Sequence, residues 1–181
     1  MRPALTFAAE LLLKAQGVSV VFLDVDGVLT DGGLFFSGRG ETLKRFDTQD
    51  GFGLQLLLSA GFQVVVVSGR DSRPLRLRVQ ALGLTHACYG VTDKVAAAQS
   101  VLELLRRRWS EVAVMGDDWP DLALMRAAAL AVAPPNAHPE VRAVADHVTV
   151  RCGGSGAVRE LCDLLLVACG KYAGLLRGAG T

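Results

Sequence analysis

The chain has 181 residues, of which 51% are hydrophobic and 20% charged, so one well-buried domain is expected and wholesale disorder is not. The formal net charge of +1 gives no overall field for attracting nucleic acid or an anionic membrane surface. No segment approaches the roughly 20 uninterrupted apolar residues of a membrane span. We therefore expect neither nucleic acid nor a membrane as a partner.

Four cysteines lack metal-type spacing and are too few for a disulfide scaffold, so buried free thiols in a reducing compartment are expected. The pattern of residues 1–17 predicts an amphipathic N-terminal helix, because Glu10 and Lys14 interrupt its apolar run and no cleavage site follows. These observations together predict a cytoplasmic protein. The cysteines are Cys88, Cys152, Cys162 and Cys169.

Residues 18–170 form the predicted domain, in which β-branched runs alternate with helical patterns. This alternation is typical of an α/β fold with a doubly wound, Rossmann-like parallel sheet. Strands are predicted over residues 18–23, 63–67, 86–89, 111–115 and 130–132. Helices are predicted over residues 54–58, with Asp50 as cap and Gly61 at the end, and over residues 73–82 and 94–108.

Two segments depart from this alternation. Residues 34–36 and 42–46 flank a glycine-containing loop, which predicts a β-hairpin inserted after the first strand. Residues 171–181 contain three glycines that argue against a stable helix, so we expect a flexible tail there.

Polar clusters follow the predicted strands at the edge of the sheet where ligands bind in such folds. Asp24 and Asp26 follow the first strand and face the same way, which places two like charges close together unless a cation or a proton separates them. The other clusters contain Ser68 and Gly69, then Lys94, then Asp117, Asp118 and Asp121. Carboxylates can hold a hard divalent cation, while Ser68 and Lys94 can neutralise phosphoryl oxygens.

Each cluster alone has an ordinary explanation. An Asp-x-Asp pair is often a turn or a cap, a lone lysine is usually solvated, and Asp121 suits the first turn of a helix that Pro120 opens. Their order along one predicted sheet favours a site.

The motifs DVDGVLT, SGR, DK and GDDWPD, beginning at residues 24, 68, 93 and 116, resemble those of the haloacid dehalogenase superfamily of phosphohydrolases. More narrowly, the chain resembles the 3-deoxy-D-manno-octulosonate 8-phosphate phosphatases. Residues 24–32, 50–54, 68–70, 116–118, 136–139 and 153–160 carry this resemblance over nearly the whole chain.

The resemblance implies a Mg²⁺-dependent phosphatase. In this family Asp24 would be the nucleophile that forms an aspartyl-phosphate, and Asp26 the general acid and base. Asp24, Asp117 and the backbone carbonyl of Asp26 would bind the metal. Asp118 and Asp121 would support those ligands, Ser68, Gly69 and Lys94 would bind phosphate, and Thr30, Arg70 and Arg78 would contact the substrate.

No gap between these motifs is long enough for a cap domain, so the site is expected to be uncovered within one chain. The resemblance implies a homotetramer in which the hairpins form an interface and the tail reaches an active site. Tyr89 and Ala123 depart from common family residues near the site.

The expected reaction is hydrolysis of 3-deoxy-D-manno-octulosonate 8-phosphate in lipopolysaccharide synthesis. Two alternatives stay open: a phosphatase for a nonulosonate 9-phosphate such as a sialic acid phosphate, and a catalytically silent regulatory subunit.

Overall fold

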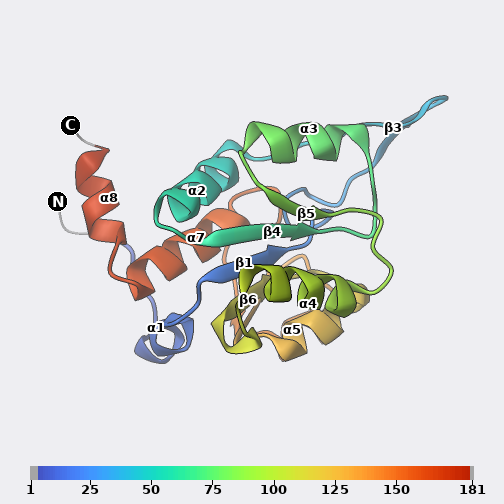
Figure 1. Ribbon diagram of the computed structural model, residues 1–181. Coiled ribbons are helices and arrows are strands. Elements are labelled where there is room, and N and C mark those ends of the chain that lie inside the picture. The colour runs from blue at the N-terminus through green and yellow to red at the C-terminus, as the bar shows by residue number, and fades with distance from the viewer. Residues whose placement is uncertain (1–3, 180–181) are drawn as a thin grey trace.

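A six-stranded parallel sheet forms the centre of the computed structural model, which describes residues 4–179 (Figure 1). The strands lie in the order β5-β4-β1-β6-β7-β8, with β1 next to both β4 and β6. Their bounds are Val20–Leu23 (β1), Gln63–Val67 (β4), His86–Cys88 (β5), Val112–Met115 (β6), Leu130–Ala133 (β7) and His147–Val148 (β8). The predicted doubly wound α/β fold is confirmed, and five of these strands lie where the sequence predicted them.

Helices cover both faces of the sheet, because the β-branched strands carry apolar side chains on both sides. One face packs against α2 (Thr48–Ser59), α3 (Arg73–Ala81) and α7 (Ala157–Ala168). The other packs against α4 (Lys94–Leu105), α5 (Leu122–Ala127) and α6 (Pro139–Val144). Short 3-10 turns lie at Trp109–Glu111 (η1) and Trp119–Asp121 (η2).

The predicted hairpin is present as β2 (Phe35–Ser37) and β3 (Gly40–Leu43), which pair antiparallel and project from the body of the molecule (Figure 1). Its apolar side chains are exposed, with Phe36 and Leu43 each 64% accessible. Between residues 4 and 179 the chain carries no cap domain over the carboxyl ends of the strands, as predicted.

The N-terminal helix is shorter than predicted and spans Ala9–Ala15 (α1). The expectation that glycines prevent a helix in the tail is wrong, because Tyr172–Gly178 form α8, whose Tyr172 and Leu175 pack against the main core. Residues 1–3 of the predicted helix and 180–181 of the tail lie outside the described residues.

The predicted cap of α2 is also wrong. Asp47 caps this helix by accepting hydrogen bonds from the backbone N–H groups of Gln49 and Asp50. Asp50 is buried inside the first turn and accepts from the backbone N–H groups of Gly156 at 3.2 Å and Arg159 at 2.7 Å. Asp50 therefore ties the start of α7 to α2, which a sequence window around residue 50 cannot reveal.

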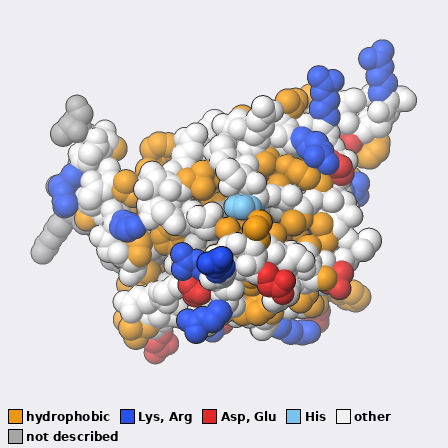
Figure 2. Space-filling model, viewed as in Figure 1, with side chains coloured by type: hydrophobic (Ala, Val, Ile, Leu, Met, Phe, Trp, Pro, Cys, Tyr) orange, Lys and Arg blue, Asp and Glu red, His pale blue; other side chains and the backbone are white. Residues whose placement is uncertain are grey.

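All four cysteines are free, but only Cys162 is buried, so the expectation of four buried thiols is wrong for Cys152 and Cys169, which are exposed. Within residues 4–179, no helix combines the length and the apolar character needed to cross a membrane. Figure 2 shows basic side chains at the projecting end of the molecule, and others interspersed with acidic ones elsewhere on that face.

Candidate active site

A pocket of about 440 Å³ opens beyond the carboxyl ends of β1, β4 and β6. It gathers the four polar clusters that the sequence predicted. Its lining residues are Asp24, Asp26, Ser68, Gly69, Arg70, Val91, Thr92, Lys94, Asp117, Asp118, Pro120 and Asp121.

The loop after β1 is fixed by a hydrogen bond to β6 and by the close approach of Asp117 to Gly27. The backbone N–H of Asp24 donates to the carbonyl of Met115 on β6, so the first aspartate is fixed to the sheet. Gly27 has a φ of +92°, and a Cβ there would lie 2.0 Å from Oδ2 of Asp117. A side chain at this position would therefore both strain the backbone and displace an acidic residue of the site.

Thr30 stabilises the loop and does not line the pocket. Its side chain is buried, accepts a hydrogen bond from the backbone N–H of Gly32 at 3.2 Å and donates to the carbonyl of Val25. Asn136 braces the same loop, because its amide donates to the carbonyl of Gly27 and its oxygen accepts from the N–H of Gly153. The structure thus places Thr30 in support of the site, away from the expected substrate contact.

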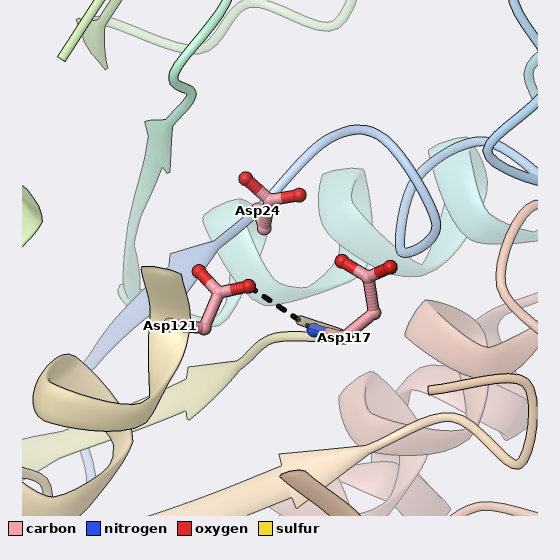
Figure 3. Close-up of side chains that lie close together, drawn as sticks. All are labelled: Asp24, Asp117 and Asp121. Carbon is pink, nitrogen blue, oxygen red and sulfur yellow. Dashed lines mark hydrogen bonds between the residues drawn. The ribbon is translucent and has the colours of Figure 1, made fainter. Parts of the chain in front are cut away.

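Three carboxyl groups converge at the pocket floor (Figure 3). Asp24 comes from the end of β1, Asp117 from the end of β6, and Asp121 from η2, and one oxygen of each lies within 4.8 Å of the others. Oδ2 of Asp121 accepts from the backbone N–H of Asp117 at 3.2 Å, which fixes the turn after β6. Asp118 caps η2 by accepting from the N–H of Trp119.

Lys94 is buried at the first position of α4 and neutralises part of this cluster. Its Nζ lies 2.5 Å from Oδ1 of Asp24 and 2.7 Å from Oδ1 of Asp121. Burial alone would lower the pKa of Lys94, but the two carboxylates outweigh it and raise that pKa above its ordinary value. Lys94 is therefore a fixed positive charge in the pocket.

The carboxyl groups of this cluster carry more negative charge than Lys94 neutralises. Burial, together with the charge of Asp121, raises the pKa of Asp24 to about 6, although Lys94 opposes the shift. Burial and the charges of Asp24 and Asp121 raise the pKa of Asp117 to about 8. Oxygen ligands crowded in this way fit a small divalent cation, which would relieve the repulsion that disfavours their ionised forms.

Ser68 and Gly69 directly follow β4 and line the same pocket as this cluster. Ser68 is 2% accessible, and its Oγ accepts a hydrogen bond from the backbone N–H of Arg70 at 3.1 Å. Nε of Arg70 lies 3.6 Å from Oδ2 of Asp26, and the Arg70 side chain is half exposed. Their roles in binding phosphate and substrate stay predictions, but the structure brings all three to the pocket.

Arg78 is not brought to this pocket. Its guanidinium donates to the carbonyl of Asp47 at 3.1 Å and lies over the ring of Phe46, 5.6 Å from the centroid. In this arrangement Arg78 ties α3 to the start of α2, so the chain's own pocket offers it no substrate contact.

Lys44 is the residue that sequence reasoning missed. It follows β3, and its Nζ contacts Oδ1 of Asp26 and lies 3.0 Å from Oε1 of Glu41. The alternating pattern of the hairpin gave no signal for this contact, because the sequence does not show where the hairpin's base meets the sheet.

Comparisons with known proteins identify the family of this chain. A sequence profile of the haloacid dehalogenase-like hydrolases matches residues 88–159. The 3-deoxy-D-manno-octulosonate 8-phosphate phosphatase KdsC of Escherichia coli (strain K12) is 41% identical over 164 residues, which cover 91% of this chain and 87% of that protein. The chain belongs to the 3-deoxy-D-manno-octulosonate 8-phosphate phosphatase family. The resemblance drawn from the motifs is thereby confirmed.

Solved structures of the family have the same fold. The phosphatase of Yersinia pestis superposes with a TM-score of 0.90 at 38% identity, covering 93% of this chain and 91% of that chain. The phosphatase of Moraxella catarrhalis, crystallised with a magnesium ion, a phosphate ion and a KDO (3-deoxy-D-manno-octulosonate) molecule, superposes with a TM-score of 0.92 at 35% identity. That match covers 95% of this chain and 99% of the other.

Proposed function

We propose that the chain is a magnesium-dependent phosphatase that converts 3-deoxy-D-manno-octulosonate 8-phosphate to the free sugar acid and phosphate, in lipopolysaccharide biosynthesis. The observation that carries this proposal is the convergence of Asp24, Asp26, Lys94 and Asp117 in one pocket. Relatives that share about 40% of their residues with this chain bear the name of that activity.

The proposed reaction has two displacements at phosphorus. A carboxylate oxygen of Asp24 attacks the phosphoryl group, the bond from phosphorus to the sugar oxygen breaks, and Asp26 donates a proton to that oxygen. A water molecule then attacks the aspartyl-phosphate while Asp26 takes its proton, and the bond from phosphorus to Asp24 breaks. Phosphate leaves and both carboxyl groups return to their starting protonation states.

Electrostatics is the main obstacle that this pocket must overcome. A phosphate dianion repels the carboxylate nucleophile until positive charge neutralises both. Lys94 provides one fixed charge beside Asp24, and Ser68 with the backbone N–H of Gly69 offers hydrogen-bond donors in the same pocket. Asp24, Asp117 and the backbone carbonyl of Asp26 would hold Mg²⁺, which when bound supplies Lewis-acid neutralisation of the phosphoryl oxygens.

Arg70 is the proposed contact for the carboxylate of the sugar acid. Its side chain is 51% exposed, and its Nε lies 3.6 Å from Oδ2 of the proposed general acid, Asp26. A planar guanidinium can bind a carboxylate with two parallel hydrogen bonds. Arg78 would reach a substrate only if the segment around Asp47 moved or if it served a neighbouring chain.

Assembly is part of the proposal because the pocket has no cover of its own. We propose a cytoplasmic homotetramer in which the hairpins, with their exposed Phe35 and Phe36, form an interface. The tail helix α8 lies at the opposite end of the molecule from β3 (Figure 1), so it cannot cover the pocket of its own chain in this arrangement. A tail that closes a neighbouring site therefore stays a prediction.

The test is phosphate release with Mg²⁺ across a panel of esters. The panel contains the octulosonate 8-phosphate, a nonulosonate 9-phosphate and simple hexose phosphates at matched concentrations. We expect kcat/KM to be highest for the octulosonate ester. A preference for the nonulosonate ester would favour that alternative, equal rates on all would contradict a specific substrate, and no release from any would favour a silent regulatory subunit.

A further inference from the structure

Lys44 is a buried charge that the proposed mechanism does not use. It directly follows the last residue of β3, and its side chain has no accessible surface. Its Nζ contacts Oδ1 of Asp26, a residue that lines the active-site pocket. The base of the hairpin therefore reaches the proposed general acid and base directly.

Glu41 lies on the other side of this lysine. Its Oε1 is 3.0 Å from Nζ of Lys44, and its side chain is only 9% accessible. Burial alone would raise the pKa of Glu41, but hydrogen bonds with Lys44 and Ser72 and the positive charges of Lys44 and Arg70 outweigh it and hold that pKa below its ordinary value. A lone buried ammonium group would be costly, so the two carboxylates explain how Lys44 is accommodated.

The contacts of Asp26 divide between its two oxygens. Oδ1 meets the fully buried ammonium of Lys44, whereas Oδ2 lies 3.6 Å from Nε of the half-exposed Arg70. Contact with a buried, charged partner restricts rotation of the carboxyl group more than contact with a mobile surface side chain. With Oδ1 engaged by Lys44, Oδ2 is the oxygen on the side of Arg70.

We propose that Lys44 is a positioning residue that holds the carboxyl group of Asp26 in its productive orientation, with Glu41 as its second anchor. This inference rests on the proposed role of Asp26 as general acid and base. It assigns the hairpin a task inside the chain in addition to the interface proposed above, because Lys44 and Glu41 belong to the hairpin and its base.

The first experiment compares Lys44→Met with a matched control, Lys14→Met. Lys14 also pairs with an aspartate, Asp146, but is exposed and belongs to α1. We expect Lys44→Met to lower kcat for the sugar phosphate about 10- to 100-fold with little change in KM, because a misplaced catalytic group costs rate more than binding. Lys14→Met should keep kcat within about twofold of the wild type.

Folding is monitored separately, because Lys44→Met leaves Glu41 without its cation. The double variant Glu41→Gln/Lys44→Met removes both charges and restores neutrality in the buried pair. We expect it to melt near the wild-type temperature yet to keep the loss in kcat. Full recovery of kcat in this double variant would overturn the proposal, because the orientation of Asp26 would then not depend on Lys44.

A double-mutant cycle with Asp26→Asn separates positioning from a general structural role. If Lys44 acts through Asp26, adding Lys44→Met to Asp26→Asn should change the residual rate by less than about twofold, so the two effects should be far from additive. In single-turnover assays, Lys44→Met should also slow the hydrolysis of p-nitrophenyl phosphate less than that of the sugar phosphate. The reason is that p-nitrophenolate leaves without a proton, so it does not need Asp26 as an acid. Additive losses, or equal losses for both leaving groups, would overturn the inference.

The positioning role of Lys44 and the proposed substrate fail under different outcomes. If the wild type prefers another ester, the octulosonate assignment fails, yet the same cycle can be measured on the preferred ester. If the wild type hydrolyses the octulosonate ester and the cycle is additive, the substrate assignment stands and Lys44 is not a positioning residue.

Discussion

The active-site edge of the sheet and the outer surface of the hairpin carry opposite kinds of side chain. At the edge, charged groups are buried and paired within the chain, as Lys94 is with Asp24 and Asp121. In the hairpin, large apolar side chains such as Phe36 face solvent. The first region is crowded with carboxylates of the kind that hold a divalent cation, whereas the second exposes apolar surface to solvent. The polar groups of the pocket are therefore paired within one chain, whereas the apolar surface of the hairpin has no partner among the described residues that covers it.

The largest loss of activity is expected when the proposed nucleophile is removed. Asp24→Asn keeps the size of the side chain but removes the attacking carboxylate, so we expect kcat to fall at least about 10³-fold. Phosphate release with saturating Mg²⁺ measures the loss. Asp31→Asn is the matched control, because Asp31 lies in the same loop but is exposed and outside the pocket lining. Phosphate release that survives Asp24→Asn would contradict a covalent role for Asp24.

A second substitution tests whether the close approach of Gly27 to Asp117 is needed for activity. Gly27→Ala introduces a Cβ where Asp117 lies, and we expect about a 10²-fold loss in kcat together with weaker Mg²⁺ binding. Gly61→Ala is the control, because Gly61 also has a positive φ, +87°, but nothing lies within 4 Å of its added Cβ. Both variants should lose stability, by roughly 1 kcal/mol or more from backbone strain. Equal effects on kcat would show that strain alone, and not contact with Asp117, is responsible.

The pH dependence of the gain in Tm on adding Mg²⁺ tests whether Asp24 and Asp117 repel each other in the metal-free protein. The pKa values of Asp117, about 8, and Asp24, about 6, lie above the ordinary value of 3.8, so the folded protein without metal binds these protons more tightly than the unfolded chain. This contribution to stability is complete below about pH 3.8 and is lost as the pH rises through 6 and 8. Since Mg²⁺ favours the ionised carboxylates, the gain in Tm on adding it should be larger at pH 8 than at pH 5.

Asp117→Asn provides the control for this effect. Without the carboxyl group whose pKa is raised most, the gain in Tm from Mg²⁺ should become smaller and less dependent on pH. Thermal melting at several pH values, with Mg²⁺ or with a chelator, gives the comparison. A Mg²⁺ effect that does not vary with pH in the wild type would show that the carboxyl groups are already ionised without metal.

The sheet and its polar edge could be predicted from the sequence because both depend on local patterns. A run such as residues 63–67 specifies a buried strand by composition alone, and a parallel sheet brings the residues that follow its strands to one edge. The positions of Asp24, Ser68 and Lys94 followed from this rule. Asp117 and Asp121 lie close together because η2 turns back directly after β6.

Contacts between distant segments could not be predicted in the same way. Asp50 caps a helix more than 100 residues away, and Lys44 reaches Asp26 only because the hairpin's base folds over the end of β1. Thr30 and Arg78 matched family positions, yet their hydrogen bonds go to the protein backbone. A motif shows which residue types occur together, but the direction of a side chain depends on tertiary packing.

The smallest effect on the chain itself is expected in the hairpin. Phe36→Ser removes an aromatic side chain that is 64% exposed, so the fold of one chain should lose little stability, within about 0.5 kcal/mol. Light scattering should nevertheless show a smaller assembly, while far-UV circular dichroism stays unchanged. Leu104→Ser is the matched control, because Leu104 is 72% exposed on α4, outside the hairpin, and its loss should leave the molar mass unchanged. A Phe36→Ser variant that keeps the wild-type molar mass would contradict the proposed interface between hairpins, because the exposed apolar side chain would then not hold chains together.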